Sequence, residues 1–352
     1  MPKDLMKGNE ALAHAAILAG CTHFFGYPIT PQNEIPEFLA RELPKAGGVF
    51  LQAESELAAI NMVYGASAVG ARPMTTSSSP GIALMQEGMS LLAAAQLPSV
   101  IVNVQRGGPG IGTIQPSQSD YYQMTRGGGN GDYRIIALAP ASAQEGAEMM
   151  MDAFELAEEY QTPVFVVSDG LLGQMMEPVE LQRRPRKRQK AKDWAAVGHG
   201  NKRAPVTVKT LALDPYVLEE INNNLQSKYQ KIANSESRYE AYHTEDAEIV
   251  FCAYGSTGRI VRNSVDQLRH EGISAGLIRP QTLWPFPDMA FTNLPETCKH
   301  IISTEMSCGQ MIDDVKLAME GRLPVSHYGR CGGIIPTPEE LAQHAKSILG
   351  RK

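Results

Sequence analysis

Short runs of β-branched and aromatic residues alternate with longer helical patterns along the first half of the chain. The runs predict strands at 23–25, 49–51, 73–76, 100–104, 135–138 and 164–167. Amphipathic or small-residue segments near 8–19, 33–43, 55–70, 81–94 and 142–160 predict the intervening helices. This alternation is typical of an α/β fold with a mainly parallel sheet between two layers of helices. Ligands of such sheets bind beyond the carboxyl ends of the strands, so the loops there are the candidate site.

The pattern changes after Leu181. Seven of the ten residues at 183–192 are Arg or Lys, and a polar stretch with one helical segment near 216–235 continues to about residue 246. The basic run is interpreted as a solvated face or, alternatively, as a patch that docks a phosphate or a partner. Strands near 249–254, 275–278, 301–304 and 325–328, with a helix opening at Gly255, then predict a smaller α/β domain. We expect a domain at 1–181, a linker at 182–246 and a second domain at 247–352.

Composition restricts the class of protein. A length of 352 residues suits two domains, and 43% hydrophobic with 20% charged residues is typical of a folded globular chain and excludes a disordered or fibrous one. The formal charge of −6 provides no field for a polyanion, so a nucleic-acid partner is not expected. Any phosphate site must therefore be local.

The cysteines are five in number and never two or three positions apart, so they provide no disulfide framework and no zinc or cluster motif. We interpret them as reduced thiols of a soluble, cytoplasmic protein. Neither a signal peptide nor a membrane span is predicted, because charges interrupt the N-terminal apolar run and polar residues and a proline break the charge-free stretch at 88–105. The scattered histidines suggest neither a metal site nor a nucleophile triad.

The sequence Tyr-Pro-Ile-Thr-Pro at 27–31 follows the first predicted strand. Its two prolines fix the backbone around the hydroxyl of Thr30. In one interpretation Thr30 caps the next helix and Pro31 occupies its first position. In the other, the hydroxyl lies at the carboxyl edge of the sheet and faces a ligand.

Two carboxylates, Glu54 and Glu56, open a helical segment that continues without charge from Leu57 to Ala71. They could simply compensate the helix dipole. Alternatively, one of them faces a buried base and holds its proton in place, an interaction that a low dielectric strengthens.

Arg106 ends the most apolar strand and enters a glycine-rich loop at 107–112. Its planar guanidinium suits an organic carboxylate, although a structural salt bridge is the alternative. The loop is not a dinucleotide fingerprint, and no Walker sequence occurs. Asp169-Gly170 and Asn222-Asn223 are too far apart, and lack the flanking residues, for a magnesium-diphosphate motif of the thiamine type.

Five segments of the first domain together resemble the alpha subunit of the 2-oxoacid:ferredoxin oxidoreductases: 27–31, 52–56, 76–81, 106–109 and 118–120. Segments 254–256 and 277–287 are similar to the transketolase C-terminal-like domain of that family. Within the family, 112–120 and 126–133 look most like the branched-chain member, 2-oxoisovalerate:ferredoxin oxidoreductase. The implied fold is a three-layer, pyrimidine-type thiamine-diphosphate-binding domain followed by that smaller domain.

The resemblance implies which residues act. Thiamine diphosphate would be shared, with its aminopyrimidine on this chain near Pro28, Ile29 and Thr30 and its Mg²⁺-diphosphate on a partner, so no metal ligand is expected here. Glu56, rather than Glu54, would hydrogen-bond the pyrimidine ring nitrogen. Thr30 would contact the substrate near the reacting carbon, and Arg106 would hold the substrate carboxylate.

The resemblance also implies an enzyme that is active only in a hetero-oligomer. A diphosphate-binding beta subunit, a gamma subunit and an iron-sulfur subunit with [4Fe-4S] clusters would accompany this chain, with coenzyme A as co-substrate and an external ferredoxin as electron acceptor. The implied reaction is the oxidative decarboxylation of a 2-oxoacid, 2-oxoisovalerate in the branched-chain member. Such a reaction belongs to the catabolism of branched-chain amino acids in anaerobic metabolism. The alternatives are 2-oxoglutarate or another 2-oxoacid as substrate, a lipoamide-linked dehydrogenase chain, or a non-catalytic assembly subunit. Cys331, where the family more often has an aromatic residue, has no explanation from sequence.

Overall fold

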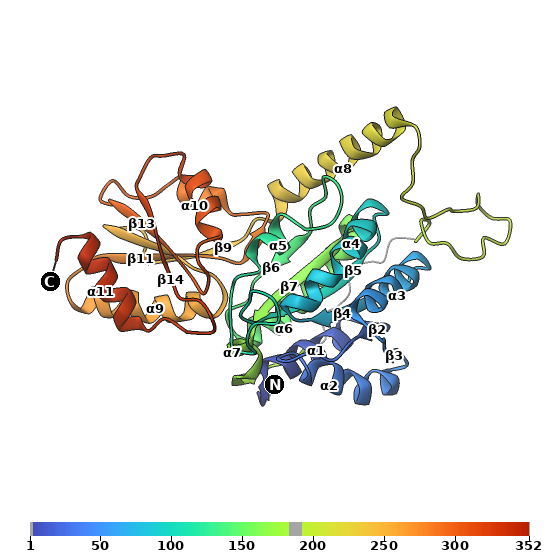
Figure 1. Cartoon of the computed structure of the whole chain (residues 1–352), viewed down its shortest axis with the longest axis horizontal. Coiled ribbons are helices and arrows are strands. Elements are labelled where there is room, and N and C mark those ends of the chain that lie inside the picture. The colour runs from blue at the N-terminus through green and yellow to red at the C-terminus, as the bar shows by residue number, and fades with distance from the viewer. Residues whose placement is uncertain (1–2, 183–191, 352) are drawn as a thin grey trace.

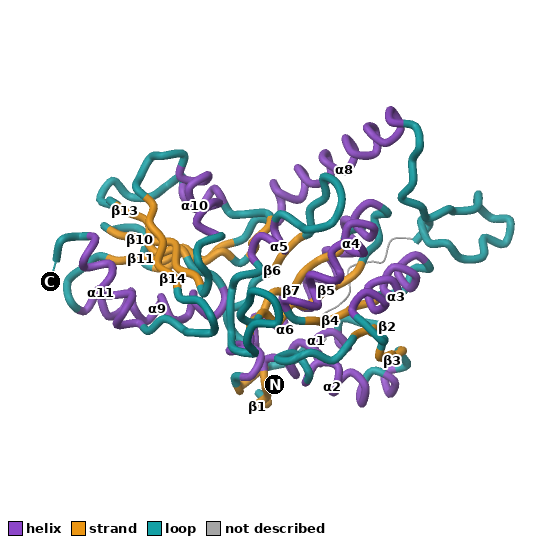
Figure 2. Tube along the Cα trace, viewed as in Figure 1, coloured by secondary structure: helices purple, strands orange, loops and turns teal. Residues whose placement is uncertain are grey.

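The computed structural model describes residues 3–182 and 192–351 and contains two main sheets flanked by helices (Figure 1). We call the seven-stranded sheet and its helices the first domain, and the five-stranded sheet and its helices the second domain. Figure 2 shows the strands of the two sheets as separate groups. Apart from Lys192, the basic run at 183–192, interpreted above as a solvated face or a docking patch, lies outside the described residues.

The first domain is built on a sheet whose strands are parallel except for one edge strand. Their order is β12 (Thr282–Trp284), β6 (Ile136–Leu138), β7 (Pro163–Asp169), β5 (Ser99–Gln105), β4 (Pro73–Ser77), β2 (His23–Gly26) and β3 (Val49–Gln52). The six predicted strands are confirmed. The antiparallel edge strand β12 comes from much later in the chain and was not predicted.

The central strands are buried on both faces, as their continuous apolar runs predict. Along β5, Val100 and Val102 belong to one apolar cluster, whereas Ile101 belongs to the cluster on the opposite face. One face is covered by α1 (Gly8–Leu18), α2 (Glu34–Glu42) and α6 (Ala143–Tyr160). The other is covered by α3 (Glu56–Ala68), α4 (Ser79–Ala94) and α5 (Tyr121–Thr125). The predicted α/β fold class is therefore confirmed.

The second domain contains a sheet in the order β14 (Val325–Gly329), β13 (His300–Glu305), β10 (Ile249–Cys252), β11 (Ala275–Pro280) and β9 (Tyr239–Tyr242). Only β9 is antiparallel to its neighbour. Two helices, α9 (Gly255–His270) and α11 (Pro338–Ile348), cover one face and lie side by side in Figure 1. The other face packs against α10 (Met311–Met319) and a short 3-10 helix, η2 (Asp288–Phe291).

The segment at 182–246, expected to be a linker, contains structure that belongs to both domains. Its 22-residue helix α8 (Pro215–Glu236) buries Leu225, Tyr229 and Ile232 against the first domain. The strand β9 forms the edge of the second sheet. The composition of α8 is polar because only this narrow stripe, spaced three and four residues apart, is buried.

Four short elements complete the fold. The strands β1 (Asp4–Lys7) and β8 (Met176–Val179) form a separate antiparallel ribbon, and α7 (Gly170–Gln174) and the 3-10 helix η1 (Pro44–Ala46) lie in loops of the first domain. Within the described residues, none of the helices combines the length and apolar character needed to cross a lipid bilayer.

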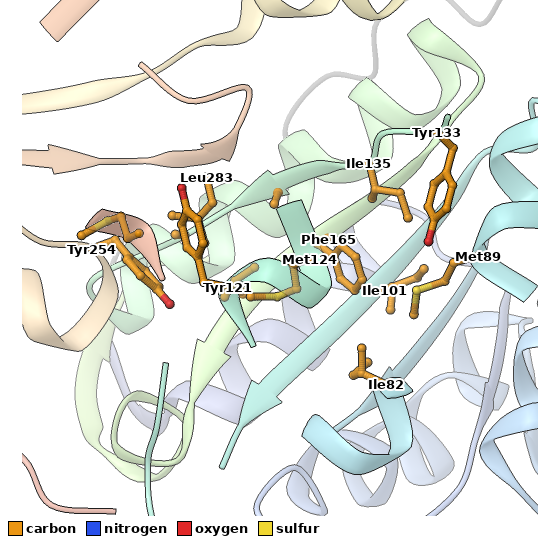
Figure 3. Close-up of a cluster of buried hydrophobic side chains, with 14 of the residues drawn as sticks. Ile82, Met89, Ile101, Tyr121, Met124, Tyr133, Ile135, Phe165, Tyr254 and Leu283 are labelled. Carbon is orange, nitrogen blue, oxygen red and sulfur yellow. The ribbon is translucent and has the colours of Figure 1, made fainter. Parts of the chain in front are cut away.

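A continuous apolar cluster joins the two domains. In Figure 3, Tyr121 of α5 lies between Leu283 of β12 and Tyr254, which precedes α9. The rings of Tyr121 and Tyr254 have centroids 6.0 Å apart. The domains therefore share one core at this point.

A buried amide also connects the domains. Gln118 of the first domain is fully buried, and its Nε2 donates to the carbonyl oxygen of Tyr254 at 2.9 Å. Its Oε1 accepts from the hydroxyl of Thr257 at 2.6 Å and from the backbone N–H of Met306 at 3.0 Å. A single side chain thus satisfies polar groups at two separate loops of the second domain.

A second set of polar contacts lies beside this amide, between α5 and α10. The hydroxyl of Tyr121 donates to Asp314 at 2.5 Å, and that of Tyr122 donates to Asp313. Arg126 forms an ion pair with Asp314 at 2.6 Å. These contacts and the shared core fix the orientation of one domain on the other.

We expect Gln118→Ala to lower the free energy of unfolding by about 3 kcal/mol, because the carbonyl of Tyr254, the hydroxyl of Thr257 and the N–H of Met306 lose a buried partner. Urea unfolding of the purified full chain measures this change. Gln226→Ala, which removes an exposed amide of α8, is the matched control and should change stability by less than about 0.5 kcal/mol. Equal stability of the two variants would contradict the role given to Gln118.

Candidate active site

The turn that carries Thr30 lies between β2 and α2 and is held by a buried glutamine. Gln32 donates from Nε2 to the carbonyl of Tyr27 at 3.2 Å, and its Oε1 accepts from the hydroxyl of Thr76 on β4 at 2.5 Å. The interpretation of Thr30 as a helix cap is wrong, because α2 begins at Glu34 with Asn33 in the capping position. Thr30 instead lies in the loop at the carboxyl edge of the sheet, where it is partly exposed.

Pro28 and Ile29 belong to the same turn. Pro28 is exposed and, with Gly26 and Gln52, lines a pocket of about 290 Å³ beyond the ends of β2 and β3. Ile29 is partly buried, and its carbonyl accepts from the N–H of Gln32 at 3.1 Å. The turn therefore exposes Pro28 and ties the backbone of Ile29 to that of Gln32.

Arg106 follows β5 and connects two loops. Its guanidinium donates from Nη1 to the carbonyl oxygen of Thr30 at 2.9 Å and from Nη2 to that of Ile111 at 3.0 Å. Its buried Nε has no hydrogen-bond partner, and none of the carboxylates in the described part of the chain lies within salt-bridge distance. The alternative of a structural salt bridge is thus not found there. A buried cation without a carboxylate partner favours binding of an anion.

Glu56 is the first residue of α3, which Ser55 caps by accepting from the N–H of Ala58 at 3.2 Å. The side chain of Glu56 is only 6% exposed, whereas Glu54 precedes the helix and is exposed. The structure records no hydrogen bond or ion pair of the Glu56 carboxylate with another described residue. Of the two carboxylates considered from the sequence, only Glu56 is buried in the fold.

Gly81 allows Glu56 to approach α4 closely. A Cβ on Gly81 would lie 2.5 Å from Oε1 of Glu56 and 2.0 Å from Oγ of Ser77, too close for any side chain. The hydroxyls of Ser77 and Ser78 are buried and unpaired. The start of α4 is therefore shaped around the Glu56 carboxylate.

Ser79 connects this region to Arg106. Its hydroxyl accepts from the N–H of Arg106 at 3.0 Å and donates to Oδ2 of Asp120 at 2.5 Å. The loops that carry Thr30, Glu56 and Arg106 are thus brought to one edge of the sheet, as predicted for residues beyond parallel strands.

A cleft of about 640 Å³ opens beside Ser79, between the two domains. The first domain contributes the glycine-rich loop at 108–111 and Asp120, and the second domain contributes Cys308, Gln310 and Cys331. A cleft between domains at the carboxyl edge of a parallel sheet is a usual place for a ligand site.

Asp120 is a functional candidate that sequence reasoning did not single out. Its carboxylate is buried and accepts from Ser79 and, at 2.9 Å, from Nδ2 of Asn103. Burial raises the pKa of this carboxyl, and the two hydrogen bonds oppose part of the rise. Its only sequence signal was its position in the segment 118–120.

Asp169, rejected above as a magnesium ligand, has a structural role at the end of β7. Its carboxylate caps α7 by accepting from the N–H groups of Leu171 and Leu172 at 2.9 and 3.1 Å, and it also accepts from the hydroxyl of Ser256. Burial raises the pKa of Asp169. In the part of the chain that the structure describes, no three His, Cys, Asp or Glu residues come together as a metal site.

Comparison with known proteins identifies the family. The model of the thiamine-diphosphate-binding domain of pyruvate flavodoxin/ferredoxin oxidoreductases matches residues 14–243, and that of pyruvate:ferredoxin oxidoreductase core domain II matches residues 247–341. The chain belongs to the 2-oxoacid:ferredoxin oxidoreductase family. The family resemblance predicted from the sequence is thus confirmed.

Two relatives within this family align along their whole length. The chain is 47% identical to ketoisovalerate oxidoreductase subunit VorB of Methanothermobacter marburgensis, over 99% of each protein. It is 37% identical to 2-oxoglutarate synthase subunit KorA of Methanocaldococcus jannaschii, over 99% of this chain and 100% of that one.

Solved structures agree with this family. A 2-oxoglutarate:ferredoxin oxidoreductase from Magnetococcus marinus, determined with 2-oxoglutarate, coenzyme A and succinyl-CoA bound, superposes with a TM-score of 0.88 at 30% identity. The match covers 98% of this chain and 65% of that longer one. A split-gene transketolase, an inactive beta4 tetramer, superposes with a TM-score of 0.62 at 13% identity over 99% of each chain, which shows the fold alone.

The raised pKa of Asp120 predicts a pH-dependent effect on stability. The pKa of this carboxyl is higher in the folded chain than in the unfolded chain, where it is about 3.9. Folding therefore becomes less favourable as pH rises from the unfolded-chain pKa through the folded-chain pKa. Asp120→Asn removes this titration. We therefore expect the melting temperature of the variant, relative to that of the wild type, to become more positive as pH rises above about 4.

Thermal unfolding of the full chain at several pH values measures this difference. Asp132→Asn, which also removes one carboxylate but from an exposed position, is the control for the loss of a charge. A difference between Asp120→Asn and the wild type that does not change with pH would show that folding does not raise the pKa of this carboxyl.

Proposed function

We propose that this chain is the alpha subunit of a thiamine-diphosphate-dependent 2-oxoacid:ferredoxin oxidoreductase. The complex would convert a 2-oxoacid and coenzyme A to acyl-CoA and CO₂ and reduce ferredoxin. The observation that carries the proposal is Glu56, a buried carboxylate without a described partner, at the same sheet edge as the buried cation Arg106. The family and the full-length relatives support it.

The residues present fit the aminopyrimidine of thiamine diphosphate. The Glu56 carboxylate can accept a hydrogen bond from a protonated ring nitrogen. Gly81 leaves room for this carboxylate, which any side chain at position 81 would displace. Pro28, Ile29 and Thr30 form the adjoining turn. When bound, the cofactor supplies a carbon nucleophile and an electron sink. The buried Glu56 carboxylate would hold the proton at the ring nitrogen.

Arg106 and Thr30 are proposed to bind the substrate. The unpaired Nε of Arg106 is free to donate to a carboxylate, and the guanidinium is already fixed by the carbonyls of Thr30 and Ile111. Pre-organisation of this kind lowers the entropy lost on binding. We assign the Thr30 hydroxyl, on the same turn, to orienting the 2-oxo group.

The remaining parts of the reaction are assigned to partner subunits. A beta subunit would hold the diphosphate with Mg²⁺, and an iron-sulfur subunit would carry [4Fe-4S] clusters. A gamma subunit would complete the complex, and an external ferredoxin would accept the electrons. The relatives are themselves named as subunits. We assign residues 1–181 to pyrimidine binding, 182–246 to the connection and 247–352 to the transketolase C-terminal-like domain, in a cytoplasmic protein.

We propose 2-oxoisovalerate as the substrate, because the relative named for ketoisovalerate is 47% identical and that named for 2-oxoglutarate is 37% identical. The alternatives are 2-oxoglutarate or another 2-oxoacid, or a non-catalytic assembly subunit. Presence of Glu56, Thr30 and Arg106 favours a catalytic chain.

Glu56→Gln in the reconstituted complex should lower turnover by about 100-fold or more, since the amide cannot hold the proton on the ring nitrogen. The measurement is 2-oxoacid- and coenzyme A-dependent reduction of ferredoxin or viologen. Glu54→Gln is the matched control, because it removes an exposed carboxylate two positions away and should keep near-normal turnover. Near-normal turnover of Glu56→Gln in an intact complex would exclude the role proposed for Glu56.

Arg106→Lys should raise the KM for 2-oxoacids by about tenfold or more with a smaller change in kcat, because the ammonium keeps the charge but loses the planar fork. Initial rates across branched, aromatic and acidic 2-oxoacids measure this effect. In the same panel, the wild-type complex should show its highest kcat/KM with 2-oxoisovalerate. A higher kcat/KM with 2-oxoglutarate would contradict the proposed substrate but not the proposed reaction. An unchanged KM in Arg106→Lys would contradict the role of Arg106 in substrate binding.

A further inference from the structure

Two cysteines far apart in sequence come together at one edge of the second sheet. The strands β13 and β14 are parallel neighbours, with Glu305 paired to Gly329 at their carboxyl ends. Cys308 follows β13 by three residues, and Cys331 follows β14 by two. Both cysteines therefore leave the sheet at the same edge, and both line the interdomain cleft.

These two thiols are exposed, whereas Cys21, Cys252 and Cys298 are buried. The side chain of Cys331 raises the pKa of Cys308, by a hydrogen bond and by its charge. Burial raises the pKa of Cys21 to about 12 and also raises that of Cys298. The exposed pair is thus the accessible thiol site of the described chain.

The loop that carries Cys308 is anchored by a buried carboxylate. Glu305 is fully buried and accepts from the hydroxyl of Ser307 at 2.7 Å and from the N–H groups of Gln310 and Met311, each at 3.0 Å. Cys308 stands inside this hydrogen-bonded turn, so its position at the cleft is defined.

The loop that carries Cys331 is held by the first domain. Gly333 packs so closely that a Cβ there would lie 2.3 Å from Cβ of Gln115, and a Cβ on Gly107 would lie 3.4 Å from the backbone nitrogen of Gly333. Gly332 and Gly333 both adopt positive φ, at 67° and 92°. The loops that carry Cys308 and Cys331 are therefore both held in place by their surroundings.

We propose that Cys308 and Cys331 form a reversible dithiol–disulfide site in the wall of the interdomain cleft. The oxidant is a low-molecular-weight disulfide such as oxidised glutathione. The thiolate of one cysteine attacks this disulfide and releases one glutathione thiolate, which takes up the proton that the cysteine lost. The second cysteine then loses its proton and displaces the second glutathione. Two protein thiols are oxidised, and one disulfide is reduced to two thiols.

The bond would join the loops after β13 and β14 beside the first-domain loop at 107–113. It would therefore restrict the cleft wall that Cys308 and Cys331 share with Gly108–Ile111. This inference concerns the two thiols alone and does not depend on the proposed reaction.

The test uses the purified full chain, treated with oxidised glutathione and then with an alkylating reagent under denaturing conditions. We expect the intact mass before alkylation to fall by about 2 Da with no glutathione adduct retained. Trypsin cleaves at Lys316, Arg322 and Arg330, so the bond would appear as a linked pair of peptides that dithiothreitol separates. Cys21, Cys252 and Cys298 should be recovered alkylated.

Single variants distinguish a pair from two independent thiols. In C308S and in C331S the remaining exposed cysteine cannot be resolved, so each should retain one glutathione adduct. C298S, which removes a buried thiol, is the matched control and should form the linked peptides as the wild type does. Two separate adducts on the wild type, or two thiols still free after treatment, would overturn the proposal.

Discussion

The arrangement of the two domains depends on the buried amide of Gln118. An amide can accept two hydrogen bonds and donate two, and here the oxygen accepts two and the nitrogen donates one across the domain boundary. Because a buried polar group without a partner is costly, any rotation of the second domain would have to break several of these bonds together. The interdomain cleft therefore has a defined shape rather than a variable one.

Buried side-chain hydrogen bonds also hold the loops at the carboxyl edge of the first sheet. Gln32 joins the turn after β2 to β4, and Ser79 joins α4 to the backbone of Arg106. Arg106 in turn fixes the carbonyl of Thr30. These hydrogen bonds fix the loops around the site, whereas the buried Nε of Arg106 and the hydroxyls of Ser77 and Ser78 remain without a described partner.

The sequence predicted features that depend on local pattern. The strands at 100–104 and 164–167 were recognisable because they are apolar on both faces, and α3 because it lacks charge after Glu56. Features that depend on contacts between distant segments could not be predicted in this way. Thr30 was considered as a cap because local spacing allowed it, although α2 begins only at Glu34. The burial of Asp120 depends on Ser79 and Asn103, and the approach of Cys331 to Cys308 depends on strand order, neither of which short-range periodicity encodes.

The strand β12 has a consequence for how the chain can be divided. Only one residue separates it from β11 of the second sheet, yet it pairs antiparallel with β6 and closes that edge of the first sheet. A chain ending near residue 246 would leave unpaired the edge of β6 that faces away from β7, and exposed sheet edges of this kind recruit other chains into aggregates. The sequence boundary between the domains is therefore not a boundary of folding: each half carries part of the other's hydrogen-bonded structure, and recombining halves from different relatives would require matched partners at β12.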